Sequence, residues 1–254
     1  MNHKPLLFLA LLLFLSSCDK QGEDHSYPVK EYVRLGIPAI NRPWTNDEFV
    51  SAVNILRLIK EKDSLALPRY DSKRSGNLFK HMISTENLAF LKGGLFSLHD
   101  KTFMLQNFLN IEGMLTGIYM NRQSGLQYYS EELTRLYIFA ITITQKMLDL
   151  AYEINISENR DARCMKSGLP AVQHIHEKML IYVLKEQEHT DSYATDDLEI
   201  MGDSISAAIR RNMDWFDSRT IAFLRNQLMT IADRSGSEKI RNDYLELSRQ
   251  LGRQ

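Results

Sequence analysis

The chain has 254 residues, with 31 lysine and arginine side chains against 32 aspartate and glutamate side chains, so its formal net charge is −1. This near-neutral balance argues against a nucleic-acid partner, because proteins that bind nucleic acid carry a basic stripe or patch. A hydrophobic content of 44% is typical of a globular protein with a real core, and the length allows one large domain or two small ones.

The first eighteen residues have the layout of a secretory signal. The apolar run 6–15 follows Lys4 and is too short to cross a bilayer, which needs roughly 20 apolar residues. It ends in Leu15-Ser16-Ser17-Cys18, which is an aliphatic residue, two small residues and a cysteine. This tetrapeptide resembles the lipobox of bacterial lipoproteins. The alternatives are an ordinary cleaved signal peptide and a buried N-terminal helix.

The lipobox resemblance implies that residues 1–17 are a signal peptide that is cut away. It also implies that Cys18 carries a diacylglycerol thioether, often with a further acyl chain such as palmitate on the new amine. Two or three chains suit a permanent anchor, because one acyl chain binds a membrane only marginally. Asp19 resembles an inner-membrane retention signal, whereas the cluster Asp19, Glu23 and Asp24 resembles the export signal of surface lipoproteins in the Bacteroidota. We expect a lipid-anchored protein of the bacterial cell envelope, in the outer membrane rather than the inner.

Residues 18–43 are predicted to be a lipidated tether followed by an extended strap. Residues 19–28 are polar and charged, as in a flexible linker, whereas residues 32–40 are too apolar to remain free in water. If Cys18 carries lipid, Cys164 is the only other cysteine, so an intramolecular disulfide is excluded. We expect Cys164 to be a small, partly buried apolar residue.

From Trp44 onward, apolar residues recur at helical spacing, which defines a predicted domain over residues 44–254. Thr45-Asn46-Asp47-Glu48 has the pattern of a capping box, and Trp44 can pack against Phe49 across it. No strand alternation or tight-hairpin signal is present in the sequence. The predicted helices cover residues 45–62, 77–83, 86–91, 101–121, 131–155, 169–185, 195–212 (opened by Thr195), 218–233 (opened by Asp217 or Ser218) and 238 onward.

The predicted helices 101–121 and 131–155 are apolar on nearly all sides, and such helices belong at the centre of a domain. We therefore predict an all-α fold, a single domain of 7–9 helices around a central antiparallel pair. Each long helix has a narrow polar stripe, which consists of Gln106, Asn110, Gly113, Gly117 and Asn121 in the first and of Arg135, Thr142, Lys146, Asp149 and Glu153 in the second.

The sharpest catalytic candidate is the dipeptide His99-Asp100. In an all-helical protein it resembles the metal-binding dipeptide of the HD phosphohydrolases, which implies an upstream histidine such as His81 and a downstream aspartate such as Asp149 or Asp161. In that family such residues share a divalent ion that activates water for attack on phosphorus. The dipeptide alone carries little information, and Asp100 has a plain role as an acid near a helix N-terminus.

The remaining ligand patterns are incomplete. His174 and His176 are two residues apart, so they point to different sides of a helix and cannot both bind one ion there. Glu186 and His189 have the spacing of a di-iron bundle ligand pair, but the second such pair is missing from the sequence. We expect His176 to be a packing histidine with satisfied hydrogen bonds, and we predict neither a metal site nor a cofactor.

The stretch 69–76 is the predicted interface. It is basic, contains a tyrosine, and joins two predicted helices. Arginine and tyrosine are favoured at interface hot spots, so we take Arg69, Tyr70, Lys73 and Arg74 as the candidate residues. The alternative is a solvated connector. The aromatic pairs Tyr128-Tyr129 and Trp215-Phe216 lie at predicted helix junctions and are expected to seal them.

These features favour a non-catalytic role. We expect a lipid-anchored envelope lipoprotein whose helical domain binds or assembles with a protein partner in the envelope, for example as an immunity-type protein against a secreted toxin or as a scaffold. The membrane would be contacted through the lipid on Cys18, and no nucleic acid is expected. The alternative is a metal-dependent phosphohydrolase that resembles the HD class.

Overall fold

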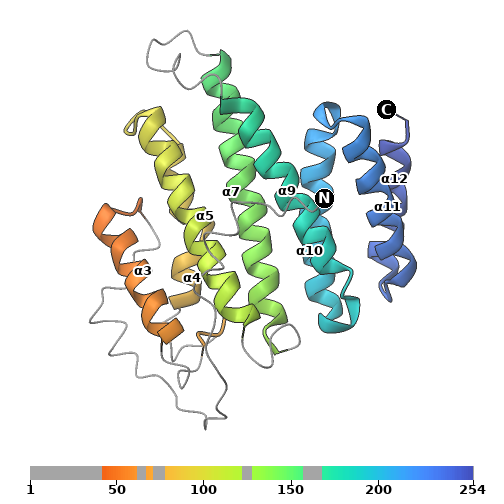
Figure 1. Cartoon of the computed structure of the whole chain (residues 1–254), viewed down its shortest axis with the longest axis horizontal. Coiled ribbons are helices and arrows are strands. Elements are labelled where there is room, and N and C mark those ends of the chain that lie inside the picture. Colours follow the sequence, from red (N-terminus) through yellow and green to blue (C-terminus); the bar gives the residue numbers. More distant parts are fainter. Residues whose placement is uncertain (1–41, 62–66, 71–77, 122–127, 157–167, 254) are drawn as a thin grey trace, which may run out of the picture.

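A computed structural model describes residues 42–61, 67–70, 78–121, 128–156 and 168–253 of the chain. The predicted signal peptide, the tether and nearly all of the strap lie outside these ranges. Within them the protein is all-α and has no strand, as predicted (Figure 1). The helices are α3 (Asn46–Glu61), α4 (Leu78–Ile83), α5 (Leu98–Met120), α7 (Ser130–Ile156), α9 (Leu169–Gln187), α10 (Thr195–Asn212), α11 (Ser218–Arg234) and α12 (Glu238–Leu251), with 3-10 helices η2 (Thr85–Leu91), η4 (Thr190–Ser192) and η5 (Met213–Trp215).

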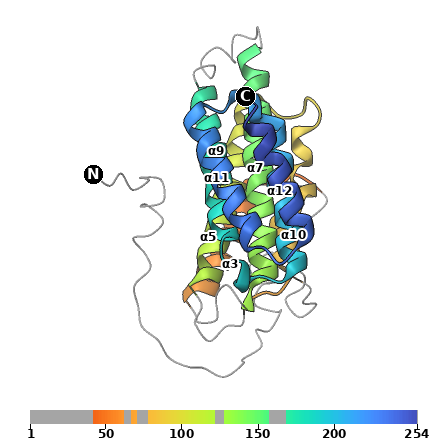
Figure 2. The same cartoon turned by 90° about the vertical axis from the view of Figure 1, so that its right-hand side faces the viewer.

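The predicted central pair is α5 and α7, which lie side by side and antiparallel. Helix α7 is the more central of the two, since α9 and α10 pack against its other side (Figure 1). Helix α3 packs against α5, and α4 contacts both α5 and α7. Helices α11 and α12 form a hairpin beyond α9 and α10. Figure 2 shows the long helices α7, α9, α10, α11 and α12 aligned along one common direction.

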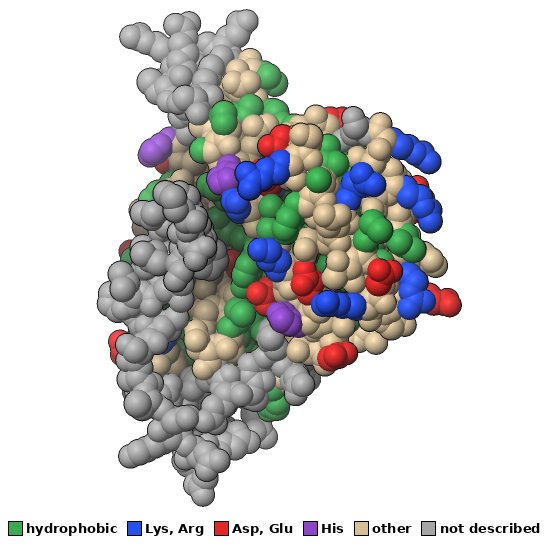
Figure 3. Space-filling model, turned by 45° about the vertical axis from the view of Figure 1, so that its right-hand side comes forward, with side chains coloured by type: hydrophobic (Ala, Val, Ile, Leu, Met, Phe, Trp, Pro, Cys, Tyr) green, Lys and Arg blue, Asp and Glu red, His purple; other side chains and the backbone are tan. Residues whose placement is uncertain are grey.

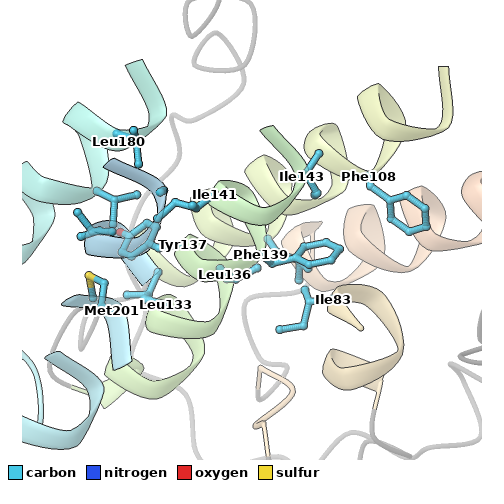
Figure 4. Packing of buried hydrophobic residues seen from close by; sticks show 14 of the residues in the cluster. Ile83, Phe108, Leu133, Leu136, Tyr137, Phe139, Ile141, Ile143, Leu180 and Met201 are labelled. Carbon is cyan, nitrogen blue, oxygen red and sulfur yellow. The ribbon is translucent and has the colours of Figure 1, made fainter. Parts of the chain in front are cut away.

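Helix α7 carries apolar residues on two opposite faces, and other helices cover both of these faces. Phe139 and Ile143 point toward Phe108 of α5, whereas Tyr137 and Ile141 point to the opposite side (Figure 4). That opposite side is filled by Leu180 of α9 and Met201 of α10. All of these side chains are buried. The most exposed of them is Ile141, with an exposed fraction of 3%. A helix hydrophobic on two faces can satisfy both only as the middle layer of a domain.

Helix starts follow local capping chemistry. Thr45 and Glu48 form the predicted reciprocal box, in which the Thr45 N–H donates to Glu48 Oε2 at 2.8 Å. Helix α5 begins earlier than predicted because Ser97 and Asp100 form a second box, with the Asp100 N–H 3.1 Å from Ser97 Oγ. The prediction that Thr195 caps α10 is wrong by one residue, since Ala194 occupies the cap position.

The short segment predicted as a helix over residues 86–91 is the 3-10 helix η2. Ser84 caps it by accepting a hydrogen bond from the Glu86 N–H at 3.2 Å. The chain leaves this segment through Gly93, whose φ of +89° lies in the left-handed region that a side chain disfavours. Among the described helices, none combines the length and the apolar character that crossing a bilayer requires.

Candidate functional site: an arginine–tyrosine cluster at the start of α7

The predicted interface residues Arg69 and Tyr70 are held against the helical core. Both bind the same oxygen of Glu132, which accepts from Arg69 Nε at 3.0 Å and from the Tyr70 N–H at 2.7 Å. The preceding carbonyl, that of Pro68, accepts a hydrogen bond from the Tyr119 hydroxyl of α5. These contacts give Arg69 and Tyr70 a structural role, and Lys73 and Arg74 lie outside the described residues.

Three cations contact three tyrosine rings around this segment. The Tyr70 ring has the Lys80 ammonium of α4 at 4.4 Å from its centroid and the Arg135 guanidinium of α7 at 4.8 Å. The Arg69 guanidinium lies 4.7 Å from the Tyr128 centroid and 5.2 Å from that of Tyr129. A cation over an aromatic face is attracted by the ring, which fixes the orientation of a long, flexible side chain. We call Arg69, Tyr70, Lys80, Tyr128, Tyr129, Glu132 and Arg135 the arginine–tyrosine cluster.

The two neighbouring tyrosines behave differently from each other. Tyr129 is buried and packs edge-on against Tyr119 at 5.2 Å, as expected of a residue that seals a junction. Tyr128 is 59% exposed, so the prediction that it seals the junction is wrong. Its ring instead lies at the surface, with the Arg69 guanidinium carbon 4.7 Å from its centroid. Trp215 and Phe216 do pack together at their junction, at 4.7 Å.

Charge and hydrogen bonding in the cluster are only partly balanced. Glu132 is fully buried, and its second oxygen, Oε2, has no hydrogen-bond partner among the described residues. Within the same ranges the buried Nε of Arg135 has no acceptor. A buried donor or acceptor without a partner costs roughly 1–3 kcal/mol, and more when the group is charged. Arg69 is therefore paired with Glu132, whereas Arg135 has no ion-pair partner in the described part of the chain.

Sequence reasoning missed Lys80, Glu132 and Arg135 as members of this cluster. Arg135 belongs to the polar stripe of its helix, which gave a weak signal. Glu132 also interrupts the apolar pattern of α7 at a position that faces inward. Neither signal identifies the partner, because Arg69 and Glu132 are 63 residues apart in the chain.

The candidate phosphohydrolase residues are not brought together. Asp100 accepts hydrogen bonds from the Ser97 hydroxyl and N–H, which lower the pKa of its carboxyl, and the charge of His99 lowers it further. Asp149, in the C-terminal part of α7, instead binds Arg211 of α10 at 2.7 Å. Over the described ranges, no group of three or more histidine, cysteine, aspartate or glutamate side chains is placed to hold a metal ion. Asp161 and Cys164 lie outside those ranges.

The two histidines of α9 point to different sides of the helix, as predicted. His174 is exposed and lies 3.9 Å from Glu177. His176 is fully buried between Thr144 Oγ1, at 2.9 Å from Nδ1, and Asn212 Nδ2, at 3.2 Å from Nε2. It is the satisfied packing histidine that its position on the helix predicted.

His176 lies in a polar network that joins α7, α9 and α10. Asn212 also donates to Gln145 Oε1 at 2.6 Å, and its own oxygen accepts from the indole N–H of Trp215 at 3.2 Å. Burial lowers the pKa of His176 to about 4, so the ring is neutral at neutral pH. A buried polar network in which every member is bonded fixes one packing arrangement of its helices.

A second buried polar group lies between α5, α7 and α9. Glu112 accepts a hydrogen bond from the Thr116 hydroxyl at 2.7 Å, and burial raises its pKa to about 7. The hydroxyls of Tyr137 and Tyr182 approach the Met120 sulfur to 3.7 and 3.4 Å. Burial also raises the pKa of Tyr182, to which the Glu112 charge contributes. Sequence reasoning treated Glu112 as part of an apolar helix and gave no hint of this role.

Surface charge is mixed on the face shown in Figure 3, where basic and acidic side chains alternate with apolar ones.

Comparisons with models of known families, with curated proteins and with solved structures find no match to this chain. The chemistry of its own side chains is therefore the basis for the function proposed below.

Proposed function

We propose that the protein is a lipid-anchored lipoprotein of the bacterial cell envelope whose helical domain binds a protein partner. The observation that carries the binding role is the arginine–tyrosine cluster. It presents Tyr128, 59% exposed, with the Arg69 guanidinium stacked on its ring. Tyrosine and arginine are the side chains that most often dominate binding energy at protein interfaces, and here both are held in place before a partner arrives.

The anchor is supported by the sequence Leu15-Ser16-Ser17-Cys18 and by the apolar run before it. Between Cys18 and the first described residue, Arg42, the chain can extend over at most about 80 Å. This length would let the domain meet partners in the membrane or next to it. We propose the outer membrane as its location.

Replacing Cys18 with alanine is expected to move the protein from the membrane fraction to the soluble fraction. The physical reason is the loss of the acyl chains, whose burial contributes about 0.8 kcal/mol for each methylene group. Fractionation of cells followed by immunoblotting measures the distribution. The same substitution at the chain's other cysteine, Cys164→Ala, is the matched control and should leave the protein in the membrane. Equal membrane retention of both variants would rule out the lipid anchor on Cys18.

Replacing Tyr128 with alanine is expected to weaken partner binding at least tenfold without affecting folding, because the ring is largely outside the core. Cells that express the tagged full-length lipoprotein are cross-linked, and proteins co-isolated with the wild type and with Tyr128→Ala are quantified by mass spectrometry. A protein recovered with the wild type should decrease at least tenfold in the variant.

The matched control is Phe103→Ala, which removes another exposed aromatic side chain, 48% exposed, from α5. Its co-isolated proteins should equal those of the wild type. If Tyr128→Ala and Phe103→Ala retain the same proteins, the arginine–tyrosine cluster is not the binding surface. Circular dichroism of the purified variants verifies that each is folded.

A further inference from the structure

The two arginines of the arginine–tyrosine cluster have donors that the protein does not use. Among the described residues, Arg69 uses only its Nε in a hydrogen bond, to Glu132. Arg135 makes neither a hydrogen bond nor an ion pair within the described part of the chain, and its Nε is buried. The outer nitrogens of the two guanidinium groups are therefore the donors that remain for a carboxylate of another molecule.

These donors are also preorganised. Arg135 is stacked on Tyr70, and Arg69 lies against Tyr128 and Tyr129. Both guanidinium groups approach the same stretch of chain, since Arg69 and Tyr70 are adjacent and Arg135 follows Glu132 by one turn of α7. A planar guanidinium whose direction is fixed loses little rotamer freedom when it forms a two-pronged bond to a carboxylate.

The charge of the two arginines favours an anion. Arg69 is paired with Glu132, whose carboxylate is fully buried and also accepts from the Tyr70 N–H. For Arg135, by contrast, the described part of the chain supplies no ion-pair partner. An incoming carboxylate would therefore meet a positive charge that no described carboxylate balances.

We infer that the partner of this surface presents an acidic segment, whose aspartate or glutamate carboxylates bind Arg135 and the outer nitrogens of Arg69 while an apolar neighbour packs on Tyr128. This inference rests on the proposed binding function and specifies the chemistry of the partner. A protein segment fits better than a membrane surface, because anionic lipid is attracted by clusters of four to eight lysines or arginines and the described cluster has three cations.

The test uses the full-length lipoprotein in nanodiscs of uncharged phosphatidylcholine. The probe is a fluorescently labelled octaglutamate peptide, and binding is measured by the anisotropy of the label at low salt. Wild-type protein should bind saturably. Arg135→Gln should weaken binding about tenfold, which corresponds to about 1.4 kcal/mol. Arg135→Lys keeps the charge but loses the planar fork, so it should recover only part of the affinity.

The matched control is Arg234→Gln, the same change at an exposed position in the last turn of α11. It should bind like the wild type. Circular dichroism without denaturant should show that all three variants are folded, because Arg135 makes no hydrogen bond whose loss would unfold the domain. Equal weakening by Arg135→Gln and Arg234→Gln would show that the peptide responds only to net charge and would overturn the inference.

Two further outcomes would also overturn it. One is that octaglutamate does not bind while Tyr128→Ala still removes a co-isolated protein, in which case the partner is not acidic but the binding function stands. The other is that nanodiscs containing phosphatidylglycerol abolish octaglutamate binding in wild type, which would show that anionic lipid occupies the cluster. If Tyr128→Ala removes no co-isolated protein, the proposed function itself fails, whatever the peptide does.

Discussion

Replacing Phe139 with alanine is expected to lower the free energy of unfolding by about 3–5 kcal/mol, as removal of a large buried aromatic side chain does elsewhere. Phe139 of α7 is 2% exposed and contacts Phe108 of α5 edge-on at 6.3 Å. Phe108 in turn packs against Trp44 at 4.9 Å and against Phe49 at 5.0 Å. Phe139 therefore joins the middle helix to the aromatic contacts that hold α3 against α5.

Urea unfolding followed by circular dichroism measures this change as a lower midpoint at an unchanged slope. The matched control is Phe103→Ala, the same substitution at a half-exposed position, for which we expect a loss of about 1 kcal/mol or less. A similar loss for both variants would mean that Phe139 does not occupy the buried position between α5 and α7.

The second large effect is on the pH dependence of stability, where two buried groups act in opposite directions. The folded-state pKa of His176, about 4, lies below the ordinary histidine value of 6.5. Between these pH values the unfolded chain binds a proton that the folded protein does not bind. The free energy of unfolding therefore falls as the pH drops from 6.5 to 4, by about 3 kcal/mol in total.

Glu112 has the opposite sign. Its folded-state pKa, about 7, lies above the ordinary glutamate value of 4.5, so between these values the folded protein holds a proton that the unfolded chain has lost. Stability therefore rises as pH falls from 7 to 4.5, again by about 3 kcal/mol. Because the two windows overlap, the contributions of Glu112 and His176 largely cancel between pH 6.5 and 4.5.

The substitution Glu112→Gln should separate the two groups. Glutamine keeps an oxygen for the Thr116 hydroxyl but has no charge to bury, so the variant should be more stable than the wild type at pH 8, by about 3 kcal/mol at most. It should then lose that advantage steadily down to pH 4.5. Urea midpoints at half-unit pH steps measure both curves.

The exposed Glu153→Gln variant, on α7, is the matched control and should follow the wild-type curve at every pH. A stability curve of Glu112→Gln that runs parallel to the wild-type curve from pH 8 to 4.5 would contradict the raised pKa. It would show that the Glu112 carboxyl is ionised in the folded protein as readily as in the unfolded chain.

Local chemistry is what the sequence predicts well here. The capping box at Thr45 and Glu48 and the cap at Asp217 need only residues within one helical turn, and both form as predicted. The buried face of α12, from Ile240 to Leu251, follows from apolar spacing alone. The opposite directions of His174 and His176 follow from the 100° that separates successive helical residues.

Two predictions that relied on short-range preferences are wrong. Ala194, which has no capping side chain, begins α10 although Thr195 looks like the better cap. The backbone of Ala194 is extended there, and Asp196 and Asp197 in the first turn compensate through their charge. Tyr128 is exposed although an aromatic pair at a junction is usually buried. In both cases the structure departs from a short-range preference.

By itself, the sequence determined the all-α class, the positions of most helices and the two nearly all-apolar helices at the centre, because helical periodicity and caps act within a few residues. Only the tertiary structure decided that α7 is covered on both sides, that Glu132 binds Arg69 and Tyr70 more than 60 residues away, and that Arg135 stacks on Tyr70. The spacing of apolar residues along a helix predicts which side chains face inward. The partner that each side chain contacts depends on how whole helices pack against one another.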